Sequence, residues 1–257
     1  VGLGCHGVVR VLLEKLPPQP AWAGHLAANL LARRPTRLAV CHDGDDRSRW
    51  GTRLAEEGTP ASDRNVFVQT IAPPTALVVF GAGDDAMPLV ALAKELGWHV
   101  TVADPRPAFA TPGRFPAADA VVVAPADQLV DRVYGAPTSP VLREVEGLAV
   151  VMTHHYIHDV PLLRSLLARP LAYLGLLGPK QRAQKILSDL APGIGASPSE
   201  LRSRLHAPVG LDLGAETPAE VALAIIAEMQ SVLARRDARP LRERSRPIHE
   251  VLAAQEP

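Results

Sequence analysis

From residue 76 onward, short apolar runs alternate with segments of helical spacing. The runs predict strands over 76–80, 98–103, 119–124, 148–152 and 171–174. The segments between and after them predict helices over 84–96, 160–167, 181–190 and 218–235. Runs without polar alternation are typical of strands buried on both faces, and helical connections between them imply right-handed crossovers. We therefore predict an α/β fold with a Rossmann-like, doubly wound parallel sheet. Thr217 and Glu220 are expected to form a capping box at the start of the last helix.

The first 72 residues have a different pattern, which predicts a smaller α+β domain. Strands are expected over 8–13, 37–41 and 66–71, a helix over 22–31, and turns over 42–53. Pro73-Pro74 marks the best boundary. We therefore assign 1–72 to this N-terminal domain, 73–235 to the Rossmann-like domain and 236–257 to a charged, proline-broken C-terminal tail. Because the chain opens on Val1 without Met, we expect the N-terminal domain to be partly truncated.

Charge and composition exclude several classes of protein. The 27 Lys and Arg residues balance the 27 Asp and Glu residues, so the chain lacks the basic charge expected of a nucleic-acid binder. No polybasic segment indicates a membrane surface, and the longest apolar run, 221–227, is far shorter than the roughly 18 residues of a spanning helix. The two cysteines, Cys5 and Cys41, provide no disulfide framework. We expect a soluble protein of the cytoplasm that binds neither nucleic acid nor membrane.

A glycine-rich turn follows the first strand of the Rossmann-like domain. Gly81, Gly83 and Ala86 form the G-x-G-x-x-A fingerprint between the strand 76–80 and a helix, which is the context that dinucleotide binding requires. Asp104 ends the next strand, about 20 residues further on, where a ribose-binding carboxylate is expected. These residues predict a nucleotide-type ligand.

Three charged residues near this turn complicate the prediction. Asp84 and Asp85 suit the positive end of the helix dipole, yet they place negative charge where a phosphate would lie. Arg106 follows Asp104 closely and is expected either to attract a phosphate or to pair with that carboxylate. Both interpretations of Arg106 stay open from the sequence.

Polar residues also follow the strand 148–152. Thr153, His154 and Asp159 lie where the carboxyl ends of parallel strands form ligand sites, so we expect them to border a cleft. Asp159 is explained equally well as the cap of a helix that begins at Val160. His154 and His158 have metal-ligand spacing on a helix, but no glutamate follows His154 and no third ligand is evident.

Two further loops carry candidate binding residues. Gly178 and Lys180 lie between a strand and a helix, which suits an anion cradle, although a tight connection explains the glycine equally well. Cys5 lies in a glycine-rich loop before a predicted strand, where an accessible thiolate would suit a soft metal or sulfur transfer. A buried structural role is the alternative for Cys5, and Cys41 is expected in the core.

Seven segments of the chain occur in a recognisable order: GLGCHGVVRVLLEKL, LVVFGAGDDAMPLVALAKELGWHVTVADPRP, RFPAADAVVV, VVMTHHYIHD, YLGLLGPKQR, PVGLDLGAETPAEVALAIIAE and PIHE. In this order they resemble the XdhC/CoxI family, accessory proteins for xanthine dehydrogenase and related molybdenum hydroxylases. In that family a Cys-containing N-terminal domain precedes a Rossmann-type domain. The resemblance therefore implies that 1–72 is the C-terminal part of the XdhC/CoxI N-terminal domain.

The resemblance also implies a function. Members of the family bind molybdenum cofactor (molybdopterin), protect it, and assist its sulfuration and insertion into the apo-enzyme. It follows that Cys5 is expected to contact the metal and that a xanthine dehydrogenase-type molybdoenzyme is the expected partner. A cysteine desulfurase and a second copy of this chain, forming a homodimer, are further partners left open.

The residues themselves leave the class of protein open. No catalytic acid–base pair is evident, which favours a non-catalytic maturation chaperone. An NAD(P)-binding oxidoreductase is the first alternative, because of the fingerprint at Gly81, Gly83 and Ala86 and the carboxylate of Asp104. A Rossmann-fold interaction module that binds no ligand is the second.

Overall fold

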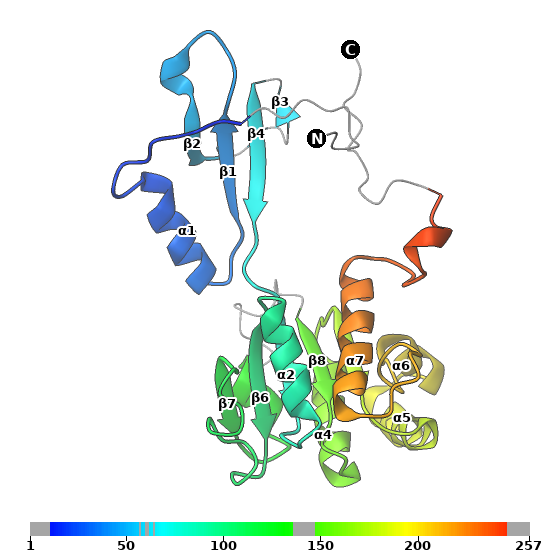
Figure 1. Ribbon diagram of the computed structural model, residues 1–257. Helices are drawn as coiled ribbons and strands as arrows, with labels where there is room; N and C mark the ends of the chain where they lie inside the picture. The colour runs from blue at the N-terminus through cyan, green and yellow to red at the C-terminus, as the bar shows by residue number, and fades with distance from the viewer. Residues whose placement is uncertain (1–10, 57, 60–61, 64, 136–146, 246–257) are drawn as a thin grey trace. The chain divides into compact units, whose positions relative to one another are not determined.

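The computed structural model describes residues 11–56, 58–59, 62–63, 65–135 and 147–245. The chain divides into two compact units, Val1–Pro74 and Thr75–Pro257, and each is described by itself (Figure 1). Within the described ranges, no helix combines the length and the apolar character that crossing a membrane requires.

The first unit is built on a small antiparallel sheet. Its elements are α1 (Ala21–Leu31), β1 (Thr36–Cys41), a 3-10 turn (Arg47–Arg49), β2 (Gly51–Leu54), β3 (Ser62–Asp63) and β4 (Val66–Ile71). The strand order is β2-β1-β4-β3, so β1 has a partner on each side. Leu38, Ala39 and Cys41 are buried along β1, and Cys41 therefore belongs to the core, as expected.

Two predictions for the first unit are wrong. Residues 11–13 form no strand, and Val11 and Leu13 are 73% and 90% exposed; the rest of the predicted strand 8–13 lies outside the described residues. β2 begins at Gly51, inside the segment predicted to form turns, because Gly51–Leu54 pairs with β1. In both cases pairing with another strand, which the local pattern does not encode, decides the outcome.

The second unit contains a parallel sheet of five strands. These are β5 (Ala76–Phe80), β6 (His99–Asp104), β7 (Ala120–Val123), β8 (Leu148–Val151) and β9 (Tyr173–Leu176). They lie in the order β7-β6-β5-β8-β9, and each neighbouring pair is parallel. The order reverses between β5 and β8, which is the switch point where doubly wound sheets bind ligands. The predicted α/β, Rossmann-like fold with a smaller α+β part is confirmed.

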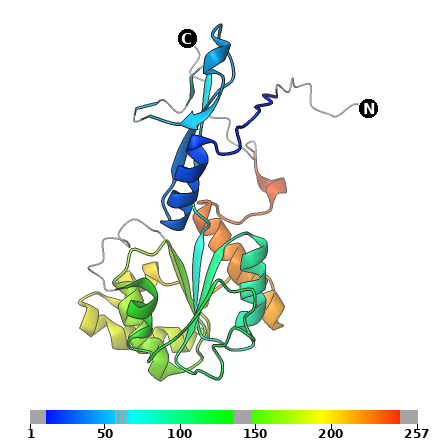
Figure 2. The same ribbon diagram turned by 90° about the vertical axis from the view of Figure 1, so that its left-hand side faces the viewer.

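Helices cover both faces of the parallel sheet (Figure 2). They are α2 (Ala86–Glu95), α3 (Leu129–Tyr134), α4 (Tyr156–Leu167), α5 (Lys180–Ile194), α6 (Pro198–Arg204) and α7 (Pro218–Leu233). Leu77 and Val79 point into a core shared with α2 and α7, whereas Val78 and Phe80 point into a core shared with α3, α4 and α5. Successive residues of β5 therefore enter different cores, which explains why the strand is apolar throughout.

Local signals determine both ends of α7. The Glu220 N–H donates to Thr217 Oγ1, and the Thr217 N–H donates to Glu220 Oε2, so the predicted capping box is confirmed. The helix ends at Leu233, two residues earlier than predicted. The cause is Arg235, which adopts a left-handed φ of 52° and donates its N–H to the Val232 carbonyl.

β9 begins at Tyr173, so the predicted strand 171–174 is shifted by two residues. The Ala172 N–H donates to the Gly147 carbonyl over 3.0 Å, just before the regular ladder starts with Tyr173 opposite Leu148. The apolar residues of 171–172 therefore lead into the ladder without belonging to it, and the strand extends to Leu176 instead.

Candidate ligand-binding crevice

Gly81 occupies the turn that follows β5. Its φ of 122° lies in the region that favours glycine, and a Cβ built here would lie 2.5 Å from the carbonyl carbon and oxygen of Met152. The Gly81 N–H donates to the Ala103 carbonyl over 2.8 Å, and the Met152 N–H donates to the Phe80 carbonyl over 2.7 Å. The ends of β5, β6 and β8 are therefore held together at a point where only glycine fits.

The Asp104 carboxylate is fully buried at the end of β6 and has several hydrogen-bond donors. Its Oδ2 accepts from the Ala82 N–H at 2.7 Å and from Arg106 Nη2 at 2.8 Å. Its Oδ1 accepts from the N–H and the Nε of Arg106 at 2.8 and 2.9 Å. Burial raises the pKa of Asp104, but these hydrogen bonds outweigh it and hold the pKa below its ordinary value. Arg106 thus pairs with Asp104, and ribose binding by Asp104 stays a prediction.

Arg106 also belongs to a cluster of two arginines around the Phe109 ring that the sequence analysis missed. Its guanidinium lies over the Phe109 ring, 4.1 Å from the centroid, and the Arg114 guanidinium lies 5.1 Å from the same centroid. Arg114 Nη2 also lies 2.5 Å from Asp84 Oδ1, in the glycine-rich turn. The negative charge of Asp84 is therefore balanced by an arginine 30 residues away, which no local pattern reveals.

Asp85 and His154 connect the two sides of the switch point. His154 Nε2 and Asp85 Oδ2 lie 2.6 Å apart, and His154 has a φ of 58°, which is uncommon for a residue with a Cβ. The other carboxylate oxygen, Oδ1, is buried and has no hydrogen-bond partner among the described residues. A Cβ at Gly83 would lie 2.7 Å from it. The Asp85 carboxylate therefore lies where a diphosphate would approach Gly83, and it has an unused acceptor.

Thr153 and Asp159 form a second polar group at the same end of β8. The Thr153 hydroxyl donates to Asp159 Oδ1 over 2.5 Å, and the His155 N–H donates to Thr153 Oγ1 over 3.1 Å. Arg182, in the first turn of α5, forms an ion pair with Asp159 Oδ2. Burial raises the pKa of Asp159, and the Thr153 hydrogen bond and the Arg182 charge offset only part of this effect. Asp159 therefore ties the end of β8 to α5.

Asp159 is not the cap of α4, so that alternative is wrong. The helix begins one turn earlier than predicted, at Tyr156, and its N-cap residue is His155. The His155 carbonyl accepts the N–H groups of His158 and Asp159 at 3.0 and 2.9 Å, which forms the additional turn. Asp159 lies within this turn, and its carboxylate points to Thr153.

Metal-binding predictions find no support in the described residues. His154 lies against Asp85, whereas His158 makes an edge-to-face contact with His155, with 5.7 Å between the ring centroids. The part of the chain that the structure describes contains no group of three His, Cys, Asp or Glu side chains that could hold a metal ion. Cys5, the predicted metal ligand, lies outside the described residues.

Gly178 and Lys180 lie at the N-terminus of α5. Gly178 has a φ of 148°, in the region that favours glycine, and Lys180 is the exposed first residue of the helix. The N–H groups and the dipole of a helix N-terminus attract anions, and an ammonium group adds to that attraction. Anion binding at this position stays a prediction.

Most of the candidate residues thus lie at the carboxyl end of the parallel sheet. We call this end of the sheet the crevice. They follow successive strand ends: Gly81, Gly83 and Ala86 after β5; Asp104 and Arg106 after β6; Thr153, His154 and Asp159 after β8; Gly178 and Lys180 after β9. The carboxyl ends of parallel strands are where ligand sites of this fold form. The crevice is therefore the candidate functional site.

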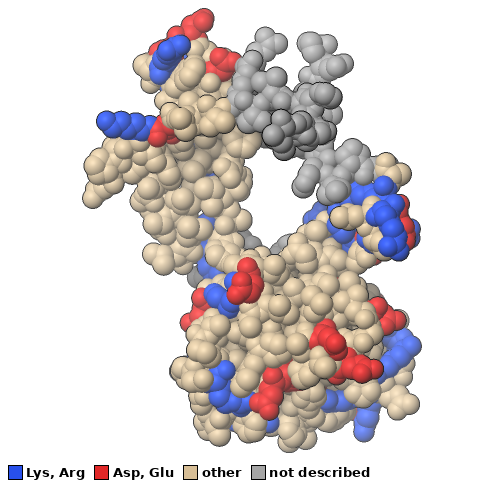
Figure 3. Space-filling view, viewed as in Figure 1, with Lys and Arg blue, Asp and Glu red and all other residues tan. Residues whose placement is uncertain are grey.

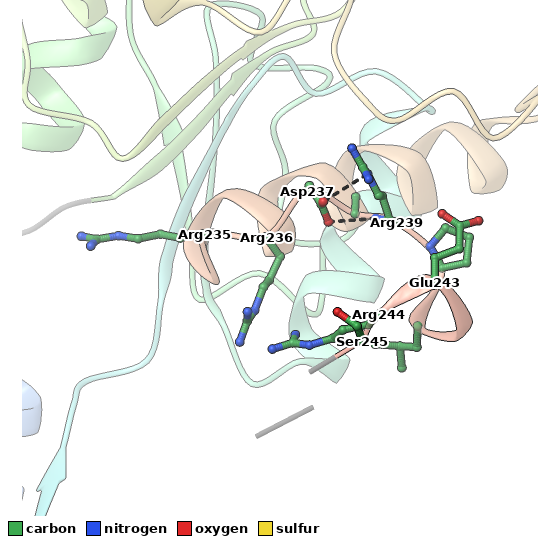
Figure 4. A pocket seen from close by; sticks show the side chains of 10 residues that line it. Arg235, Arg236, Asp237, Arg239, Glu243, Arg244 and Ser245 are labelled. Atoms are coloured by element: carbon green, nitrogen blue, oxygen red, sulfur yellow. Dashed lines mark hydrogen bonds and ion pairs between the residues drawn. The ribbon is translucent and has the colours of Figure 1, made fainter. Parts of the chain in front are cut away.

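The C-terminal segment forms a separate cavity of about 440 Å³, lined by residues between 235 and 245. Figure 3 shows Lys and Arg side chains gathered over this segment, and Figure 4 shows Arg239 joined to Asp237. The two side chains are exposed, with 3.2 Å between Arg239 Nε and Asp237 Oδ2, so the pair contributes little. One continuous stretch of chain supplies every wall, so this cavity does not bring together residues from different helices and strands. It is therefore a weaker candidate for a functional site than the crevice.

A parallel sheet in this order, with polar residues at its switch point, defines a Rossmann-type domain. The family described as the XdhC Rossmann domain matches residues 77–229, which is more than half of the chain. The chain therefore belongs to the XdhC Rossmann-domain family, as the resemblance predicted.

Individual relatives cover the chain in part. A probable xanthine dehydrogenase subunit of Bacillus subtilis (strain 168) is 38% identical over 165 residues, 64% of this chain and 45% of that protein. The uncharacterized protein YqeB of Escherichia coli (strain K12) is 30% identical over 187 residues, 70% of this chain and 32% of that protein. The chain thus spans less than half the length of either relative. A crystal structure described as a xanthine dehydrogenase from Bacillus halodurans has the same fold, with a TM-score of 0.64 at 24% identity, and the match covers 84% of this chain and 66% of that chain.

Proposed function

We propose that this chain is a maturation factor that binds molybdenum cofactor and assists its sulfuration and insertion into a xanthine dehydrogenase-type molybdoenzyme. Membership of the XdhC family supports the maturation role. The crevice supports a bound ligand that carries a phosphate and a polar ring. A cysteine desulfurase would supply the sulfur, and Cys5 would contact the metal of the cargo.

The observation that carries the proposal is the Asp85–His154 pair at the switch point. Asp85 Oδ1 is a buried acceptor without a donor among the described residues. The pyrimidine edge of a pterin presents neighbouring N–H donors, and a carboxylate accepts two such donors side by side. We therefore assign the N–H donors of the pterin edge to the two carboxylate oxygens of Asp85. Because His154 occupies Oδ2 in the structure, its ring would leave this oxygen as the pterin binds.

Two neighbouring features complete the binding site. The phosphate of the pterin is assigned to the N-terminus of α5, where Lys180 and the helix dipole attract an anion. Arg106 and Phe109 stack on each other after β6, and their flat surface suits contact with a ring. In this arrangement the chain binds and shields its cargo, and no residue of the crevice is assigned a catalytic step.

Titration of the purified protein with molybdopterin tests the proposal, together with fluorescence of copurified pterin after oxidation. Asp85→Asn keeps the shape of the side chain but removes the charge, so it is expected to weaken binding about tenfold or more. The matched control is Glu95→Gln, which changes an exposed carboxylate in the last turn of α2. Equal retention of pterin by these two variants, or no uptake by the parent protein, contradicts the assignment.

An NAD(P)-dependent oxidoreductase is the second candidate, and the fingerprint at Gly81, Gly83 and Ala86 is the observation that favours it. The two candidates give opposite results for Asp85→Asn. Removing a negative charge beside a diphosphate is expected to strengthen NAD(P) binding, whereas the same change weakens pterin binding. Calorimetric titrations of parent and variant with NAD, NADP and molybdopterin therefore separate them. Binding of the partner molybdoenzyme without either ligand would indicate an interaction module.

A further inference from the structure

A second cavity, of about 210 Å³, lies near the start of β9. The start of β9 is at the amino end of the parallel strands, and the crevice is at their carboxyl end. Its walls come from the end of α4, the chain leading into β9, and the end of α6. The residues that the argument uses are Arg169, Tyr173, Arg204 and His206. The cavity exceeds by far the roughly 10–15 Å³ that one water molecule requires.

Arg169 is the buried cation of this cavity. Only 7% of its side chain is exposed, and its Nη2 donates to Asp131 Oδ1 at 2.8 Å and to the Gly135 carbonyl at 2.7 Å. Its Nε is buried and has no acceptor among the described residues. A buried guanidinium donor without an acceptor is costly, so it favours an anionic or polar occupant.

Arg204 and His206 add two further groups to the same wall. Arg204 Nη2 donates to the backbone carbonyl of Arg169 at 3.4 Å, which holds the second guanidinium against the chain at that residue. The His206 ring stacks on Tyr173, with 4.3 Å between centroids, and its Nδ1 lies 3.1 Å from Glu228 Oε1. This pairing leaves Nε2 as the ring nitrogen that an occupant can reach.

The carboxylate partners of these groups lie outside the cavity wall. Asp131 binds Arg169 from α3 and Glu228 binds His206 from α7, and neither residue lines the cavity. Burial raises the pKa of Glu228, but hydrogen bonds from His206, Tyr173 and the Gly210 N–H outweigh it and lower the pKa. Glu228 is thus an anion that holds His206 in place.

We propose that this cavity binds a phosphate group, as inorganic phosphate or as the phosphate of a monoester. The wall offers two guanidinium groups and an imidazole, and none of its residues is Asp or Glu. Guanidinium groups match the oxygen geometry of phosphate, and a partly enclosed position strengthens such hydrogen bonds. The proposal is independent of the function proposed for the crevice.

Titration of the full chain with inorganic phosphate and with glycerol 3-phosphate, followed by NMR of backbone amides, tests this site. Both probes share the phosphate chemistry, and binding of the monoester would show that a larger molecule can supply the phosphate. Shifts are expected at Ser203–His206, and Arg204→Gln is expected to weaken binding about tenfold. Arg202→Gln, an exposed change on the same helix, is the matched control and leaves the affinity unchanged.

Lys180→Gln distinguishes this cavity from the N-terminus of α5, the other anion site considered above. Weaker phosphate binding in Lys180→Gln but not in Arg204→Gln overturns the proposal. Equal weakening in Arg202→Gln and Arg204→Gln also overturns it, because a diffuse surface charge then explains the binding. No binding of either probe at millimolar concentration has the same consequence. Loss of pterin binding in Asp85→Asn bears only on the crevice.

Discussion

Asp104→Asn should destabilise the Rossmann-like unit, because each carboxylate oxygen of Asp104 accepts two donors. Oδ2 accepts from Ala82 N–H and Arg106 Nη2, and Oδ1 accepts from the N–H and Nε of Arg106. An asparagine has only one oxygen, so in either orientation its NH₂ group faces two donors. An unsatisfied buried donor costs about 1–3 kcal/mol. The Arg106 side chain is 30% exposed and regains some water, so we expect a total loss of about 2–4 kcal/mol.

Differential scanning calorimetry measures this loss. For a domain of this size, about 2–4 °C of Tm accompanies each kcal/mol, so the transition of this unit should fall by about 4–16 °C. Glu95→Gln serves as the surface control. The double variant Asp104→Asn/Arg106→Gln should lose less free energy of unfolding than the two single variants lose together, by about 0.5–3 kcal/mol, because the two residues are partners. Additive costs, or a loss below about 0.5 kcal/mol for Asp104→Asn, would refute the reasoning.

The pH dependence of this difference has a definite sign. The folded-state pKa of Asp104 lies below its ordinary value, so the unfolded chain takes up the proton first as pH falls. The stability that the carboxylate contributes is therefore fully present above the unfolded pKa of about 3.9 and is lost as pH falls through the folded pKa. The gap in stability between the parent protein and Asp104→Asn should be constant at neutral pH and shrink in acid.

Two further variants test separate parts of the chain. Cys5→Ser is expected to reduce cofactor retention with little effect on folding, whereas Cys41→Ser, at a buried position, should lower Tm more than retention; undiminished retention in Cys5→Ser would make Cys5 structural. Arg235→Gly should raise the free energy of unfolding by about 0.5–1 kcal/mol, because a residue with a Cβ is strained in the left-handed conformation and glycine is not. The greater entropy of glycine in the unfolded chain cancels only part of this gain. Chemical denaturation measures the change, with Arg239→Gly as the control, and an equal loss in both variants would contradict the explanation.

Features of the fold that depend on short stretches of chain were predictable. The fingerprint predicted a glycine-rich turn between a strand and a helix, and Gly81 lies in such a turn after β5 with a φ of 122°. The Thr217 capping box was likewise predictable, because both partners lie within one turn. By contrast, the apolar residues Val11 and Leu13 indicated a strand that does not form, since no local signal shows whether a partner strand is present.

The pairings inside the crevice were not predictable. His154 meets Asp85 from 69 residues away, and Arg182 meets Asp159 from 23 residues away. Asp159 followed by Val160 and proline has the sequence of a helix cap, but its carboxylate pairs with Arg182 on another helix, and α4 begins a turn earlier. Such partners depend on which elements the sheet brings together, and one sequence carries that information only through the complete fold.

The partners of the crevice carboxylates differ in a way that bears on ligand binding. Asp84, Asp104 and Asp159 pair with Arg114, Arg106 and Arg182, respectively. Asp85 pairs with a histidine, His154. Arginine keeps its charge in proteins, so these three carboxylates stay neutralised and tie loops together. The imidazole of His154 offers Asp85 one ring nitrogen, whereas a guanidinium offers a carboxylate up to five N–H donors. This difference is the reason that the proposed function assigns the ligand to Asp85. The buried Oδ1 of Asp85, which has no hydrogen-bond partner among the described residues, follows β5 at the switch point, where doubly wound sheets bind ligands. The carboxylate with a free acceptor thus lies at the position that the proposed function requires.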